Sequence, residues 1–246
     1  MEFVYLALIW AVASFINSLS GMGAGMLAVP CMLLFMNVHL IVPLSCLLGT
    51  ILSLGLFIQY RKEFQLKNII PALIGSIPGV FIGTYILTVV SSHVIEIMMA
   101  VFLISYVVWN FLQKQEQNEE KDTITLVGVI CGFFAGFLGA TTSFSGPPVG
   151  IFVLYAGWRK QKALAAMGGA FVLINTVTCV SQYFAGLYTK ELLGYWLAGA
   201  PACILGMILA APIVKYISQS LFRKIVLIII GSAGLISLFR VISYYF

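Results

Sequence analysis

Long apolar segments separated by short polar turns recur along the whole chain. Most have the roughly 17–25 residues that an α-helix needs to cross the hydrocarbon core of a bilayer. Runs without charge give segments at about 3–19, 25–37, 40–60, 68–90, 94–112, 124–142, 147–157, 163–185, 191–214 and 221–241. We therefore expect an all-α integral membrane protein.

The composition agrees with this pattern. The chain of 246 residues is 61% hydrophobic and 9% charged, with a mean hydropathy of +1.08, whereas soluble domains carry roughly 25% charged residues. The N-terminal MEFVYLAL has no positively charged region, so we expect the first segment to be a retained helix and not a cleaved signal peptide. The five cysteines lie in apolar segments without a CxxC spacing, which is typical of packing residues.

The two halves of the chain resemble each other. A polar linker, residues 113–123, separates a first membrane repeat, residues 1–112, from a second, residues 124–246. A shift of 123 residues, which is half of 246, aligns Ser20 with Ser143, Gly23 with Gly146, Gln59-Tyr60 with Gln182-Tyr183, Pro78 with Pro201 and Gly83 with Gly206. This register indicates an internal duplication within one transport domain. Both glutamines lie near segment ends, where anchoring at headgroup level and contact with a substrate are the two interpretations.

Each half also contains a glycine-rich interruption. Residues 19–30 read LSGMGAGMLAVP, and residues 142–152 read TSFSGPPVGIF. The segments that follow, 25–37 and 147–157, would rise only about 17–20 Å as helices, against a hydrocarbon core of about 30 Å. We expect each to be a half-helix that forms a broken, re-entrant hairpin with the segment before it.

The basic residues favour hairpins over single broken crossings. If each broken segment crossed the membrane once, seven of the thirteen basic residues would lie on one side of the membrane and six on the other. If each formed a hairpin, eleven would lie on one side and only Lys190 and Arg240 on the other. Cytoplasmic loops are enriched in Lys and Arg. Each repeat is then a hairpin plus three transmembrane helices, which makes the repeats inverted, places both termini outside and leaves the linker in the cytoplasm. The eleven are Arg61, Lys62, Lys67, Lys114, Lys121, Arg159, Lys160, Lys162, Lys215, Arg223 and Lys224.

The two interruptions predict an anion site. Discontinuous helices of inverted-repeat transporters meet near the bilayer midplane, and a helix N-terminus there offers free N–H groups and a positive dipole end. Tight helix packing by the glycines is the alternative reading. The predicted substrate-binding residues are Asn17, Ser20, Gly21, Gly23, Gly25, Ser143, Ser145, Gly146, Pro147 and Asn175, with Asn17 and Asn175 as side-chain donors.

Catalytic and metal chemistry find no support. All eight acidic residues fall in loops or near segment ends, so no carboxylate marks a cation or proton site at mid-membrane. Ser145 could act as the nucleophile of a membrane protease only with a base to activate it, and the two histidines, His39 and His93, lie at segment ends. We expect no enzyme activity, no cofactor and no metal site. An anion channel or a structural subunit of a membrane complex is the alternative to a transporter.

The stretch from Gly21 to Pro30 resembles the glycine-rich motif of the sulfite exporter TauE/SafE family, with Ala24 in place of one glycine. The stretch from Ser145 to Pro148 is similar to the family's second Gly-Pro-rich turn, and the resemblance covers essentially the whole chain. It implies a secondary transporter of sulfite or organosulfur anions such as sulfonates, working by alternating access. The implied partners are this anion and the bilayer, with a homodimer as an open possibility and no nucleic acid.

Overall fold

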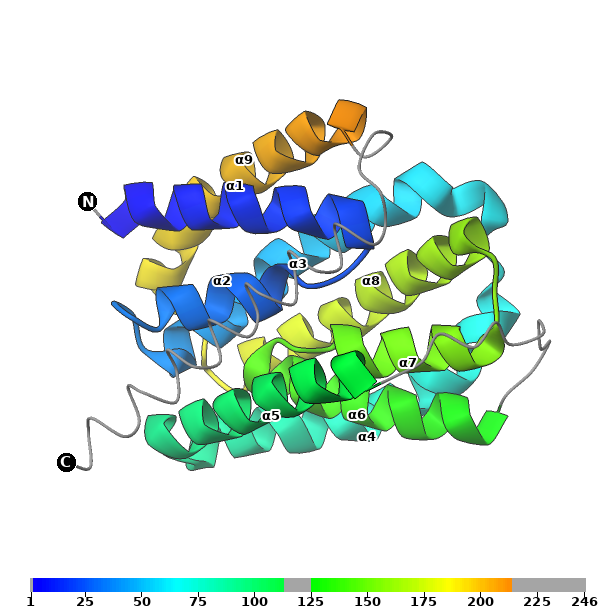
Figure 1. Ribbon diagram of the computed structural model, residues 1–246. Coiled ribbons are helices and arrows are strands. Elements are labelled where there is room, and N and C mark those ends of the chain that lie inside the picture. Colours follow the sequence, from blue (N-terminus) through cyan, green and yellow to red (C-terminus); the bar gives the residue numbers. More distant parts are fainter. Residues whose placement is uncertain (1, 113–124, 214–246) are drawn as a thin grey trace.

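The computed structural model describes residues 2–112 and 125–213, and these are almost entirely helical (Figure 1). We find no strand in these two ranges. The elements are α1 (Glu2–Ser20), α2 (Ala24–Met32), α3 (Val38–Tyr60), the short 3-10 helix η1 (Arg61–Glu63), α4 (Leu66–Val89), α5 (Ser92–Leu112), α6 (Thr125–Thr142), α7 (Gly146–Ala156), α8 (Lys160–Phe184) and α9 (Lys190–Ile213).

The helix boundaries follow the expected apolar segments closely. The clearest difference is α2, which ends at Met32 and not at residue 37. The reason is local, because Asn37 is the N-cap of α3 and its Oδ1 accepts a hydrogen bond from the His39 N–H at 2.9 Å. The linker at 113–123 and the expected segment at 221–241 lie outside the described residues.

The helices satisfy the length and composition needed for a membrane protein. Within residues 2–112 and 125–213, six of them are long and apolar enough to cross a bilayer, namely α1, α3, α4, α6, α8 and α9. This set differs from the six crossings expected from the sequence, because the hairpin interpretation assigns α1 and α6 to the re-entrant segments. With 19 residues, α1 is about 28 Å long. α2 and α7 have 9 and 11 residues, about 14 and 17 Å, so they are the short helices that the sequence predicts.

Glycines bring two pairs of helices into close contact. α4 packs along α6, and a Cβ added at Gly83 would lie 2.5 Å from the Phe137 carbonyl oxygen. α1 packs along α9 in the same way, where a Cβ on Gly206 would overlap the Ala11 carbonyl. Gly83 and Gly206 are partners under the 123-residue shift. Close glycine packing is common between membrane helices, so the packing interpretation holds for these glycines.

The two long helices α3 and α8 cross in the middle of the bundle. Their crossing is close, because a Cβ on Gly168 of α8 would lie 2.9 Å from the backbone nitrogen of Phe57 on α3. α4 also packs on α8, where the Ser181 hydroxyl donates to the Thr84 hydroxyl at 3.0 Å. α3 and α8 therefore form a shared centre against which the other helices are placed.

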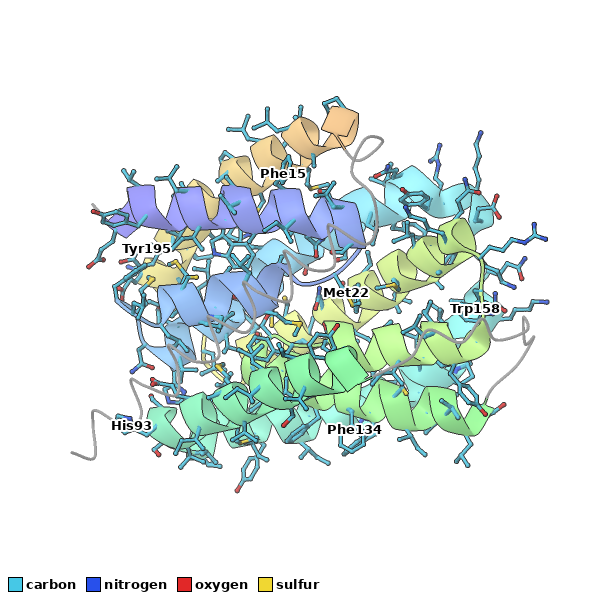
Figure 2. The ribbon with its side chains drawn as sticks, in the orientation of Figure 1. Phe15, Met22, His93, Phe134, Trp158 and Tyr195 are labelled. Atoms are coloured by element: carbon cyan, nitrogen blue, oxygen red, sulfur yellow. The ribbon has the colours of Figure 1, made fainter. Side chains whose placement is uncertain are left out.

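The hairpins enter this bundle from opposite ends. Figure 1 shows α1 running inward from the end that carries the N-terminus and α2 returning toward it, whereas α6 and α7 form the corresponding pair from the other end. In Figure 2, His93 and Tyr195 lie at one end of the bundle and Trp158 lies at the other end. Met22, in the first interruption, lies between these two ends. The first helix break therefore lies inside the bundle.

Candidate functional site

The first break is a tight turn built on two glycines. Gly21 and Gly23 have φ angles of 79° and 108°, in the left-handed region that favours glycine. The Gly21 N–H donates to the Asn17 carbonyl at 2.7 Å, which ends α1. The Ser20 hydroxyl accepts from the Met22 N–H at 3.3 Å and donates to the Ile16 carbonyl at 3.1 Å. Ser20 therefore fixes the turn through backbone bonds.

Beyond this turn, α2 begins with its N-terminus inside the protein. The Leu27 N–H donates to the Gly23 carbonyl at 3.1 Å, and the Ala24 N–H donates to Asn17 Oδ1 at 3.4 Å. Gly25 and Met26 lie in the first turn, where N–H groups have no partner within the helix. These two N–H groups are the donors that α2 can offer to a bound group.

The second break has a different construction. Ser143 adopts a left-handed φ of 64°, and its N–H donates to the Gly139 carbonyl at 2.9 Å. α7 then starts at Gly146, followed by Pro147 and Pro148. Proline suits the first turn of a helix because its missing N–H would be unpaired there. For the same reason α7 offers fewer N–H donors than α2, and its contribution is mainly its dipole and the neighbouring serines.

The two breaks contact each other. A Cβ on Gly25 would lie 2.5 Å from the Ser143 carbonyl oxygen and 3.0 Å from the Ser143 hydroxyl. Met22 of the first break packs over the start of α7, with its Cβ 3.2 Å from a Cβ built on Gly146 and its Cε 3.0 Å from one built on Gly150. The N-termini of α2 and α7 thus meet in one place (Figure 2).

A small cavity lies between the breaks. Its lining includes both breaks together with residues of α1, α3 and α8. Its volume is about 50 Å³, on a scale where one water needs roughly 10–15 Å³. It can therefore hold about three to five atoms the size of a water oxygen. The lining residues are Trp10, Asn17, Gly21, Met22, Gly23, Ala24, Gly25, Met26, Ser45, Gly49, Leu52, Ser53, Ser143, Ser145, Gly146, Phe171 and Asn175.

Most of the residues predicted from the sequence line this cavity. Ser20 and Pro147 do not line it, since Ser20 holds the first turn and Pro147 is buried within α7. Binding of an anion by the others stays a prediction. The predicted residues that share the cavity are Asn17, Gly21, Gly23, Gly25, Ser143, Ser145, Gly146 and Asn175.

Two further cavity residues are not predicted from the sequence. The indole N–H of Trp10 and the hydroxyl of Ser45 are each buried without a hydrogen-bond partner in the described part of the chain. Both residues are 1% exposed. Buried polar groups are normally paired, and each exception calls for an explanation. A single Trp or Ser within a long apolar helix forms no recognisable sequence motif. These two residues are therefore identified only because both line the cavity.

The cavity contains polar groups but no charge. Among the described residues, no Asp, Glu, Lys, Arg or His lines it. Asn175 faces Gly49 across the cavity, with its Nδ2 3.3 Å from a Cβ built on that glycine. Ser53 bonds to its own helix, at 2.8 Å from the Gly49 carbonyl, as Ser and Thr in membrane helices usually do. The site therefore presents mainly neutral hydrogen-bond donors.

The repeated Gln-Tyr pair has two different environments. Gln59 is exposed, whereas Gln182 is fully buried and donates through Nε2 to the Ala140 carbonyl at 3.2 Å and to Cys46 Sγ at 3.7 Å. Anchoring at headgroup level is therefore the wrong interpretation for Gln182. Its amide instead ties α8 to α6 and α3.

Comparisons with known proteins identify the family. Searches of curated proteins and of solved structures gave no significant match. The family model described as sulfite exporter TauE/SafE matches residues 6–236, which include both helix breaks and nearly the whole described bundle. The chain therefore belongs to the sulfite exporter TauE/SafE family.

Proposed function

We propose that this protein is a multi-pass transporter that binds a small sulfur oxyanion, such as sulfite or a sulfonate, in the cavity between the helix breaks. One observation carries the proposal. The N-termini of two half-helices meet at one cavity, and the residues that line it include Trp10 and Ser45, whose donors are buried without a partner in the described chain. Helix N-termini and unpaired N–H or O–H groups both favour negative charge and acceptor oxygens.

The size of the cavity supports a small substrate. A volume that holds about three to five water-sized atoms suits a sulfur atom with three oxygens. Cation carriers usually keep a carboxylate in the membrane interior. Among the described residues, no carboxylate lines this cavity. The polar backbone at this depth is also tolerated only where it is buried in protein or lines a wet cavity.

We further propose an inverted-repeat topology in the cell membrane, with both termini outside and the 113–123 linker in the cytoplasm. Several observations support it. The 123-residue shift carries α1, α2, α3 and α4 onto α6, α7, α8 and α9 within about two residues, and the α1–α9 contact parallels the α4–α6 contact. The basic segments at η1 and at residues 159–162 lie at the same end of Figure 1, opposite the N-terminus. Cytoplasmic loops are enriched in such residues.

Alternating access between two orientations of the hairpins is the mechanism that this topology favours. Export is the direction we propose, because an inside-negative potential drives an uncoupled monoanion outward, at about 2.3 kcal/mol per 100 mV. Import would require a coupled cation. Proteoliposomes with an imposed potassium-diffusion potential test this, since uphill anion uptake that needs a proton or sodium gradient would contradict it.

Counterflow of labelled sulfite in proteoliposomes tests the transporter proposal itself. A carrier is accelerated by unlabelled substrate on the opposite side, whereas an anion channel is not. Thermal unfolding of the purified protein in sulfite, a sulfonate, thiosulfate, sulfate and a carboxylate adds an independent binding measurement, because ligands of the folded state raise the midpoint by mass action. No stabilisation by any of these anions would contradict the proposed site.

A further inference from the structure

We infer that the substrate leaves the cavity toward the end of the bundle that carries the N-terminus through a buried file of polar side chains, and that Tyr188 is the gate of this route. The polar file consists of Thr50, Cys46, Cys179, Gln182 and Tyr188. The inference rests on the proposed function and adds a route and a gate to the proposed binding site. It depends on contacts that link the polar file to the cavity at one end and to a second, larger cleft at the other.

The polar file begins at the wall of the cavity. The Cys46 thiol donates to the Gly139 carbonyl at 3.5 Å. The same carbonyl accepts a hydrogen bond from the N–H of Ser143, which lines the cavity. On α3, Thr50 directly follows Gly49, another lining residue. The first two members of the file therefore lie next to the cavity without lining it.

The polar file then continues from α3 to α8. The hydroxyl oxygen of Thr50 lies 3.8 Å from the sulfur of Cys179. The side-chain amide of Gln182 donates to the Cys46 sulfur at 3.7 Å. Gln182 follows Cys179 by about one helical turn, so these contacts follow one face of α8 toward its end at Phe184.

Tyr188 ends the polar file, in the turn between α8 and α9. Burial and the nearby Cys179 thiol raise the pKa of Tyr188, so its hydroxyl lies on the side of the file. The two residues that flank it, Leu187 and Thr189, line a cleft of about 470 Å³. Tyr195, which also lines this cleft, marks its end of the bundle in Figure 2. Tyr188 therefore stands between the cleft and the buried thiols.

Two atoms of the polar file are unexplained by packing. Gln182 Oε1 and the Tyr188 hydroxyl are buried without a hydrogen-bond partner in the described part of the chain, although buried polar groups are normally paired. Polar residues that face the interior of a membrane bundle often mark a substrate pathway. Cys46 lies about 12 Å along α3 from its start at Val38, so the file covers the depth between cleft and cavity. Its position and polarity fit a route that is closed in this structure.

The charge of the cleft favours exit of an anion over capture. Glu2 and Glu191 line the cleft together with His39, whereas its lining within the described residues includes no Lys or Arg. The Glu2 carboxylate accepts a hydrogen bond from the Tyr195 hydroxyl at 2.8 Å. Carboxylates repel an anion at short range. An anion that reaches the cleft is therefore released and not retained.

Thiol labelling tests the gate. Intact cells carrying the full-length chain with Cys179 as its only cysteine are treated from outside with membrane-impermeant sulfonatoethyl methanethiosulfonate. Tyr188→Ala should raise the rate of Cys179 modification at least about tenfold, because cysteine reactivity depends on access. Tyr188→Phe keeps the ring and should leave the reaction slow. In a chain that keeps only Cys203, which is 0% exposed on α9, Tyr188→Ala should have no effect.

Transport by Thr50→Val provides a second measurement that does not depend on the folding of Tyr188→Ala. The change keeps the size and removes one hydroxyl from the polar file, and Thr50 does not line the cavity. We expect the Kd of methanesulfonate to stay unchanged and its flux in proteoliposomes to fall at least about fivefold. Thr176→Val is the matched control, because this exposed hydroxyl donates only to the Val172 carbonyl of its own helix. It should change neither quantity.

The outcomes separate the two proposals. An unreactive Cys179 in folded Tyr188→Ala protein, or unchanged flux in Thr50→Val, would overturn the route and leave the proposed binding site intact. Absence of methanesulfonate binding to the unmodified protein, together with absence of flux, would contradict the proposed function itself. The labelling of Cys179 needs no bound substrate, so it reports on the gate alone.

Discussion

The carbonyl oxygen of Ser143 lies 2.5 Å from the position that a Cβ would occupy on Gly25. Real Cβ atoms do not approach an oxygen so closely, so residue 25 must be glycine for the two helix breaks to meet. The contact joins a half-helix of the first part of the chain to the left-handed turn of the second part. Both residues also line the cavity.

Gly25→Ala should therefore weaken both anion binding and folding. The added methyl group would overlap the Ser143 carbonyl and separate the breaks. We expect loss of at least about tenfold in affinity and a thermal midpoint lowered by the overpacking, which typically costs about 1–3 kcal/mol. Gly194→Ala is the matched control, because a Cβ there meets nothing within 4 Å and should leave both measurements unchanged.

Gly23→Ala tests the turn without a steric clash. Gly23 has a φ of 108°, and a Cβ there also meets nothing within 4 Å, so the change acts through backbone strain of about 1–2 kcal/mol. We expect a folded protein whose α2 N-terminus is misplaced and whose anion affinity falls. Gly186→Ala carries comparable strain at a φ of 75° but lies outside the cavity. Equal loss of binding in both variants would contradict a specific role for Gly23.

Trp10→Phe and Ser45→Ala should both weaken anion binding, and Ser45→Ala should do so without loss of stability. Each change removes a buried donor that has no partner in the described chain. Ligand-free Ser45→Ala should therefore be equally stable or slightly more stable, whereas Trp10→Phe also leaves unfilled space at a fully buried position and should lower the stability. The anion, in contrast, loses a hydrogen bond worth about 1.5–3 kcal/mol to a charged group. We expect affinity to fall about tenfold or more in a titration followed by calorimetry.

Trp196→Phe is the control for this pair. Its indole N–H is also buried without a described partner, but Trp196 does not line the cavity. Its affinity should match that of the unmodified protein. Unchanged affinity in Trp10→Phe and Ser45→Ala would show that their donors do not contact the substrate.

Asn175→Asp should abolish anion binding at neutral pH. The side chain faces the cavity opposite Gly49, and an ionised carboxylate there would repel a bound anion at short range. Asn175→Leu, similar in size and neutral, should retain weak binding because only a donor is lost. Radiolabelled uptake in proteoliposomes distinguishes the two. Equal activity of both variants would place the substrate away from Asn175.

The proposed topology predicts which positions can be labelled from outside. In a variant without its native cysteines, Asn118→Cys in the linker should react with a membrane-impermeant thiol reagent only after the cells are opened. Ser91→Cys, exposed in the turn between α4 and α5, should react on intact cells. The opposite labelling pattern would reverse the orientation, and labelling of both positions from outside would contradict the inverted repeat.

The local features of this protein can be predicted from its sequence. Apolar runs specify the helices because a bilayer-spanning helix must be apolar over its whole length. Glycine and proline at 21–25 and 146–148 specify where helices stop and restart, because their backbone preferences act within a few residues. The family motif lies at the same positions. For these reasons the short helices α2 and α7 and eight of the cavity residues are predictable from the sequence.

Which polar groups share a cavity depends on the packing of the helices. Gln59 and Gln182 occupy equivalent sequence positions, yet one is exposed and the other is buried against Ala140 and Cys46. Trp10 and Ser45 have no sequence signal and line the same cavity only because α1, α2 and α3 pack around the breaks. In a chain that is apolar almost everywhere, hydropathy does not tell a lipid-facing residue from a core residue. Burial and pairing depend on the neighbouring helices, so they are properties of the packed fold.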